Sequence, residues 1–147
     1  NSNKVAPMYP DFVRKDGDRY VALADAKYKR FLTRDDRLQM IAYSFIYDAK
    51  VVSIIYPPED VNCEDKKEPG DDEAVIDGTN DNKLSRRGWF NIRSVSSQTI
   101  DKTTNKYLRI ISLGKITTRD SFEDFAGVMH ERECRLRQML QETEPAS

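Results

Sequence analysis

Cysteine, histidine and long apolar runs are scarce in this sequence, and each scarcity excludes a class of protein. The 147 residues contain two cysteines and one histidine. Two cysteines, Cys63 and Cys134, do not make the disulfide framework of a small secreted domain. The sequence shows no charged-then-apolar signal segment, and no apolar run approaches the roughly 18 residues of a membrane span. We therefore expect a cytoplasmic, reducing setting.

The net charge of −1 conceals an uneven distribution. Residues 59–81 carry ten Asp and Glu but two Lys and Arg, which leaves 22 basic and 15 acidic residues elsewhere. The acidic stretch has too few apolar residues to fold alone, so we expect a loop insertion over 59–83. The basic remainder is compatible with a polyanionic partner, and the length suits a single domain.

Turn residues and alternation predict a hairpin near the start of the chain. Asp11–Lys15 and Arg19–Asp25 read as two strands joined by the sequence DGD, because a glycine between aspartates supplies the positive φ of a tight turn. With Gly17 as the pivot, residue 11 faces residue 23.

A helix is predicted over 34–49, with Thr33 and Asp36 as its capping box. Apolar residues recur there at i, i+3, i+4, i+7, i+8 and i+11. A strand is the competing interpretation, because apolar and aromatic residues also alternate over 41–47. The residues expected on the apolar face are Leu38, Ile41, Ala42, Phe45, Ile46 and Ala49.

The second half of the chain alternates between strand and helix patterns. The run KVVSIIYPP, residues 50–58, is typical of a strand buried on both faces. Two further strands are predicted at 88–95 and 105–113, within the region 87–113. A last helix over 120–142, with Asp120 and Glu123 as its box, is expected to bury Phe122, Phe125, Ala126, Met129, Leu136 and Leu140. Together these elements predict an α/β fold with a mixed central sheet flanked by helices.

The hairpin carries residue types that suit a metal-dependent hydrolase. Side chains alternate along a strand, so Asp25 and Lys27 point to one face and Ala26 to the other. The Gly17 pivot places Asp11 diagonally next to Asp25, within reach of a shared ion. Carboxylates, a backbone carbonyl and water are the ligands that Mg²⁺ prefers. A neighbouring lysine can position the attacking water and offset charge on a phosphate oxygen.

The order Pro10-Asp11, then Asp25-Ala26-Lys27, is the PD-(D/E)xK pattern, and Gln39 and Tyr43 add a Gln-x-x-x-Tyr arrangement on the next helix. Followed by VVSIIYP, this run resembles the restriction-endonuclease-like superfamily. Over residues 9–58 it resembles the nuclease domain of McrC, the cleavage subunit of McrBC-type modification-dependent restriction systems. The resemblance implies a restriction-endonuclease-like fold, with 1–147 as one nuclease domain around a core at 9–58.

The resemblance also implies a role for each of these residues. Asp11, Asp25 and the carbonyl of Ala26 would ligate Mg²⁺, for which Mn²⁺ can substitute, and Lys27 would act on the water. Gln39 and Tyr43, one helical turn apart, would orient the lysine region or contact the DNA backbone. In the family a GTP-driven AAA+ partner, McrB, brings the nuclease to DNA. This chain has no P-loop, so nucleotide hydrolysis would belong to that partner.

One departure from the family concerns the start of the chain. Related nucleases often add an acidic residue from a helix upstream of the first aspartate, whereas the ten residues before Asp11 include none. Either the chain is the C-terminal part of a longer protein or its site lacks this acid.

Two other functions stay open. One is a RecB/Cas4-like nuclease, whose common iron–sulfur cluster needs more than two cysteines. The other is a catalytically inactive nuclease-fold module that binds DNA or a partner ATPase or GTPase.

Basic residues outside the pattern are candidates for DNA contact: Lys29, Arg30, Arg86 and Arg87. The neighbouring Trp89 and Phe90 are expected to enter the core rather than to stack on bases. His130 and Cys134, at i and i+4, have the spacing of half a zinc site, but an exposed polar pair is the favoured interpretation.

Overall fold

The computed structural model describes residues 8–28, 32–56, 74–75, 88–96, 99–113 and 121–145. They form a mixed α/β fold, which confirms the predicted class. The elements in chain order are β1 (Phe12–Asp16), β2 (Arg19–Ala26), α1 (Arg34–Ile46), β3 (Val51–Tyr56), β4 (Ala74–Val75), β5 (Trp89–Ser96), β6 (Thr99–Ser112) and α2 (Phe122–Gln141).

The strands of the described ranges form one mixed sheet in the order β1-β2-β3-β6-β4, with β5 also paired to β6. The β1–β2 and β5–β6 pairs are antiparallel, whereas β2, β3 and β6 run parallel to one another. A parallel connection requires a crossover, and α1 supplies it between β2 and β3. The carboxyl ends of β2 and β3 therefore meet at one edge of the sheet.

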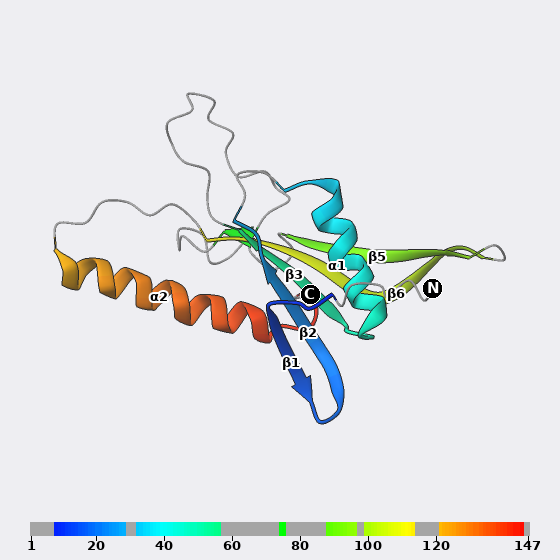
Figure 1. Ribbon diagram of the computed structural model, residues 1–147, viewed down its shortest axis with the longest axis horizontal. Helices are drawn as coiled ribbons and strands as arrows, with labels where there is room; N and C mark the ends of the chain where they lie inside the picture. The colour runs from blue at the N-terminus through cyan, green and yellow to red at the C-terminus, as the bar shows by residue number, and fades with distance from the viewer. Residues whose placement is uncertain are drawn as a thin grey trace, which may run out of the picture.

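The core lies on both faces of this sheet. Every residue of β3 is buried, as predicted for the run of apolar residues that forms it. On one face, Met40 and Tyr43 of α1 pack with Leu23, Val52 and other apolar residues. On the other face, the C-terminal part of α2 packs on Ala24, Ile55 and Ile111. A helix therefore packs on each face, α1 on one and the C-terminal part of α2 on the other (Figure 1). Asp25 is two residues from Leu23 in β2 and so lies on the face that α1 covers.

The hairpin forms where predicted, but its register differs from the expected one. Gly17 adopts φ 59°, the left-handed conformation that the turn requires. The turn leaves both Gly17 and Asp18 unpaired between Asp16 and Arg19, and a bulge between Arg14 and Lys15 leaves Val21 as an extra residue in β2. Each of these shifts the pairing by one residue, so Phe12 pairs with Ala24 and not with residue 22. The expected pairing of residue 11 with residue 23 is therefore wrong. Continued by one residue, the observed register puts Asp11 opposite Asp25, closer than the predicted diagonal.

The first helix confirms the predicted cap and corrects the predicted face. Thr33 is the N-cap, and Thr33 and Asp36 form the reciprocal capping box. The helix ends at Ile46 rather than 49. The buried residues of α1 are Asp36, Met40, Tyr43 and Ser44, whereas Leu38, Phe45 and Ile46 are about half exposed or more. Lys27, which directly follows β2, explains this rotation, because its ammonium is a partner for Gln39 and Asp36 on the inward face of α1.

The last helix also begins and packs differently from the prediction. Ser121 is its N-cap and accepts a hydrogen bond from the Asp124 N–H, so Asp120 and Glu123 are not the box. Leu136, Met139 and Leu140 pack on the sheet. Phe122, Phe125, Ala126 and Met129 are exposed, Phe122 by 79 %. A helix of 20 residues is about 30 Å long, and only its C-terminal end overlies the sheet (Figure 1).

Two arginines from the sheet hold the C-terminal end of α2. Arg14 Nη1 donates to the carbonyl of Gln141 at 2.7 Å. Arg109 Nη1 donates to the carbonyl of Met139, and its Nη2 lies 2.9 Å from Glu142 Oε2. Burial lowers the pKa of Arg109, and Glu142 opposes that shift. Cations at the carboxyl end of a helix satisfy its unpaired carbonyls and its dipole.

The remaining strands are longer or more numerous than predicted. β6 begins at Thr99 rather than 105, and β5 continues to Ser96. Within the stretch expected to be a loop insertion, Ala74–Val75 form β4, parallel to β6. The rest of the predicted insertion lies outside the described residues. In the described part of the chain, no helix is long and apolar enough to cross a membrane.

Candidate active site

The open end of the β1–β2 hairpin, opposite its turn, is fixed by the backbone N–H groups of two successive residues. The N–H of Ala26 donates to Asp11 Oδ2 at 2.8 Å, and the N–H of Lys27 donates to the carbonyl of Ile55 at 2.8 Å. The N–H and C=O of a strand residue point to the same edge, so the carbonyl of Ala26 faces Asp11. Asp11 and this carbonyl are therefore neighbours at the open end of the hairpin.

Lys27 is the centre of the polar network at this edge of the sheet. Its Nζ lies 2.5 Å from Asp25 Oδ2 and donates to Gln39 Oε1 at 2.8 Å. The side chains of Lys27 and Asp25 are 14 % and 8 % exposed, which leaves the pair mostly shielded from water. Charge-assisted hydrogen bonds of this kind are short and strong. The ammonium is thus held in one position by a strand carboxylate and a helix amide.

The helix α1 extends this network to the segment that carries Asp11. Gln39 Nε2 donates to the hydroxyl of Tyr43 at 3.0 Å, and that hydroxyl donates to the carbonyl of Tyr9 at 3.2 Å. Tyr43 is 1 % exposed, so this is a core tyrosine and not one on a solvated rim. Tyr47 OH adds a hydrogen bond to the carbonyl of Met8 at 2.8 Å. The order of contacts therefore runs from Asp25 through Lys27, Gln39 and Tyr43 to the residues before Asp11.

Sequence reasoning missed Asp36 as a member of this site. Its Oδ1 lies 4.0 Å from Lys27 Nζ, and its side chain is 4 % exposed. The sequence had indicated only one role for Asp36, as the partner of Thr33 in the capping box. That role accounted for the residue type without any contact with the site. A further signal was available: Asp36 and Gln39 are three residues apart, so on a helix they share a face.

The oxygen-rich end of the hairpin fits the chemistry of Mg²⁺. Two carboxylates and a backbone carbonyl are hard donors, and Mg²⁺ commonly takes one or two carboxylates and completes its shell with water and phosphate. Asp11 and Asp25 each engage Oδ2 in a protein contact, with Ala26 and Lys27 respectively. Over the described ranges, no group of three or more His, Cys, Asp and Glu side chains is placed to hold a metal ion. A cation here would therefore depend on the two aspartates and the carbonyl.

Among the described residues, the other candidates take no part in these hydrogen bonds. Lys29, Arg30, Arg86 and Arg87 lie outside the described residues, so their expected contact with DNA has no structural counterpart here. The Sγ of Cys134 lies 3.7 Å from Nε2 of His130, and both side chains are exposed on α2. Trp89 and Phe90 are half-buried, with Phe90 packed against the core.

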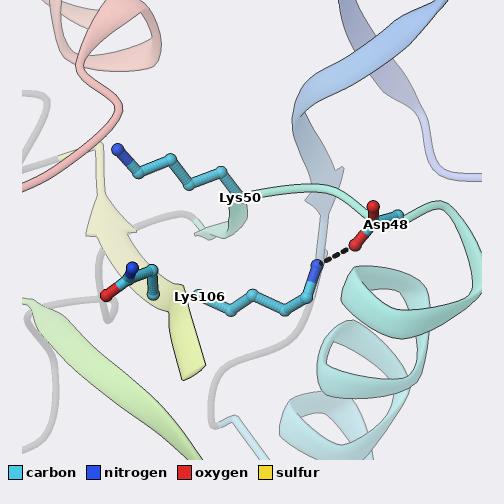
Figure 2. A pocket seen from close by; sticks show the side chains of 4 residues that line it. Asp48, Lys50 and Lys106 are labelled. Atoms are coloured by element: carbon cyan, nitrogen blue, oxygen red, sulfur yellow. Dashed lines mark hydrogen bonds and ion pairs between the residues drawn. The ribbon is translucent and has the colours of Figure 1, made fainter. Parts of the chain in front are cut away.

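A hollow lined by polar residues lies at the opposite end of the parallel strands; its residues are Asp48, Lys50, Asn105 and Lys106 (Figure 2). Lys106 Nζ lies 2.7 Å from Asp48 Oδ1 and also donates to the carbonyls of Ser44 and Ala49. Lys50 Nζ lies 3.1 Å from an oxygen of Glu144. Each ammonium here already has an anionic partner. Lys106 joins β6 to the C-terminal end of α1, and Lys50 joins the start of β3 to the segment after α2.

No protein-family model, no curated protein and no solved structure matches the chain.

Proposed function

We propose that this chain is a Mg²⁺-dependent DNA endonuclease with a restriction-endonuclease-like fold, acting as the nuclease subunit of a McrBC-like restriction system. The observation that carries the proposal is the position of Lys27, which follows β2 directly and contacts both Asp25 of β2 and Gln39 of α1. Asp11 reaches the same hairpin end through the N–H of Ala26. Four residues of the sequence pattern, Asp25, Lys27, Gln39 and Tyr43, are thus joined by consecutive contacts, and the fifth, Asp11, contacts the backbone between Asp25 and Lys27.

In this proposal Asp11, Asp25 and the carbonyl of Ala26 hold the cation, and Mn²⁺ can replace Mg²⁺. The bound cation supplies Lewis-acid stabilisation of the phosphoryl group that is attacked. Lys27 donates hydrogen bonds to the attacking water or to a non-bridging phosphate oxygen, where negative charge develops. Gln39 and Tyr43 keep the ammonium in place, because each donates or accepts a hydrogen bond in the chain that ends at Lys27.

The proposed partners are DNA and a GTP-driven AAA+ subunit of the McrB kind. Phosphodiester hydrolysis by this site requires a bound nucleic acid, and the chain has no P-loop that could drive translocation. Lys29, Arg30, Arg86 and Arg87 are the residues proposed to contact the DNA backbone.

Nicking of supercoiled plasmid tests the proposal. The chain is incubated with Mg²⁺, with Mn²⁺ or with chelator, alongside Lys27→Ala, Asp25→Ala and the control Asp16→Ala. Asp16 is an exposed carboxylate at the far end of the same hairpin. We expect metal-dependent nicking by the chain and by the control, and loss of about 100-fold or more in both site variants.

A nuclease-fold binding module predicts a different pattern. In that case no variant nicks DNA, with or without an AAA+ partner, and DNA affinity is the same in Lys27→Ala, Asp25→Ala and the unchanged chain. That result would contradict hydrolysis at the hairpin. Nicking that persists in both site variants would contradict it as well.

A further inference from the structure

Lys27 lies near two buried carboxylates rather than one. Its Nζ is 2.5 Å from Asp25 Oδ2 and 4.0 Å from Asp36 Oδ1. Asp36 Oδ2 accepts hydrogen bonds from the backbone N–H and the hydroxyl of Thr33, both at 2.8 Å. The cap therefore fixes one oxygen of Asp36 at the helix terminus, and the other oxygen is the one nearer to the ammonium.

A cation at the hairpin end and the ammonium of Lys27 compete for Asp25. Both are positive, and both are drawn to the same carboxylate. A buried charge without a partner strongly destabilises a protein. If Asp25 binds the divalent cation, the ammonium of Lys27 therefore needs a second anionic group. Gln39 Oε1, at 2.8 Å, can hold the ammonium but cannot neutralise it. Among the described residues, Asp36 is the nearby carboxylate that can neutralise it.

We propose that Asp36 is a positioning residue, which pairs with the ammonium of Lys27 when a divalent cation binds Asp25. This inference rests on the proposed function, because it assumes that a cation binds at the hairpin end. The required change is small: the separation between Lys27 Nζ and Asp36 Oδ1 shortens from 4.0 Å to about 2.8 Å, the length of a charge-assisted hydrogen bond. Asp36 thus favours cation binding without contacting the cation.

The affinity of the intact chain for Mn²⁺, measured by calorimetry, tests this role without any activity assay. Asp36→Asn retains an oxygen acceptor for Thr33 and removes the charge near Lys27. We expect it to weaken Mn²⁺ binding by about threefold or more, within the range of coupling between neighbouring residues. Asp35→Asn is the matched control, because Asp35 is exposed in the same first turn and its loss changes the helix terminus by the same charge. The control is expected to bind Mn²⁺ as the unchanged chain does.

A second pair of variants separates positioning from general electrostatics. Lys27→Met removes the competing ammonium, so Asp36→Asn should have no further effect on Mn²⁺ affinity in that background. An equal weakening in both backgrounds would overturn the inference, because Asp36 would then attract the cation directly. Unchanged affinity in Asp36→Asn alone would overturn it too, while the cation site and the proposed function would stand.

The unchanged chain provides a further readout that does not depend on the folding of a variant. In ¹⁵N nuclear magnetic resonance, the Nζ signal of Lys27 should shift on addition of Mg²⁺ and stay protected from exchange with water, because Asp36 and Gln39 continue to hold the ammonium. Loss of that signal to fast exchange would show that Lys27 is released instead, which contradicts the inference. Absence of any cation binding would remove both this inference and the proposed metal site.

Discussion

Replacement of Lys27 by methionine should destabilise the protein, and Mg²⁺ should restore part of the loss. The side chains of Lys27 and Asp25 are 14 % and 8 % exposed, so the variant leaves a mostly buried carboxylate without its cation. Removal of one partner from such a pair costs about 3 kcal/mol. For a domain of this size, that lowers the melting temperature by roughly 6–12 °C.

Added Mg²⁺ should then stabilise the variant more than the unchanged chain, because the ion neutralises Asp25 and no ammonium competes for it. At an ion concentration about ten times the dissociation constant, binding contributes about 1.4 kcal/mol. Differential scanning fluorimetry with and without Mg²⁺ measures both effects. Lys15→Met is the control, since Lys15 is exposed on the same hairpin and its ammonium lies over the ring of Tyr20. It should cost less than about 1 kcal/mol and show no added response to the ion.

Two results would refute this reasoning. A Lys27→Met variant within about 1 kcal/mol of the unchanged chain would mean that the pair with Asp25 is not buried as described. A destabilised variant that gains no more from Mg²⁺ than the unchanged chain would mean that Asp25 does not bind the ion.

Three further variants test other parts of the account. Tyr43→Phe removes a buried hydroxyl with two hydrogen bonds, which should lower the free energy of unfolding in urea by about 1–3 kcal/mol. The variant should also nick plasmid more slowly, and an unchanged nicking rate would separate this tyrosine from the site. Arg109→Met removes a charged donor to the end of α2 and should cost about 2 kcal/mol. It should also expose the amides at the C-terminal end of α2 to hydrogen exchange, and undiminished protection would contradict this role of Arg109. The hydrogen bond and charge of Lys106 lower the pKa of Asp48 from its ordinary 3.8, so the folded state favours the carboxylate. The unchanged chain should therefore be slightly more stable than Asp48→Asn at pH 7, and this difference should vanish as the pH falls through the lowered pKa. A difference that persists in acid would contradict this linkage.

Local sequence patterns predicted the elements that build the site, because each has a short-range physical cause. The turn at Gly17 and the capping box of Thr33 and Asp36 depend on neighbouring residues alone. The shared face of Asp25 and Lys27 follows from strand alternation. These patterns anticipated that Asp25 and Lys27 share one face at the end of the hairpin, but they did not reveal that Asp36 lies beside Lys27.

Register and helix rotation depend on longer-range contacts and were predicted less well. The bulge that leaves Val21 unpaired shifts the hairpin register and is not encoded by any turn residue. The inward face of α1 carries Asp36 and Tyr43 because Lys27, which directly follows β2, presents a polar partner to it, which an apolar periodicity cannot reveal. The exposure of Phe122 reflects how far α2 extends beyond the sheet, a property of the whole fold.

The central claim is that the end of the β1–β2 hairpin is a divalent cation site, and paramagnetic broadening by Mn²⁺ tests it most directly. With the ¹⁵N-labelled chain and a small fraction of an equivalent of Mn²⁺, we predict selective loss of the amide signals of Asp11, Phe12 and residues 25–27. The signals around Asp48, at the opposite end of the sheet, should remain. Broadening around Asp48 with an unaffected hairpin end, or no selective broadening at all, would contradict the claim.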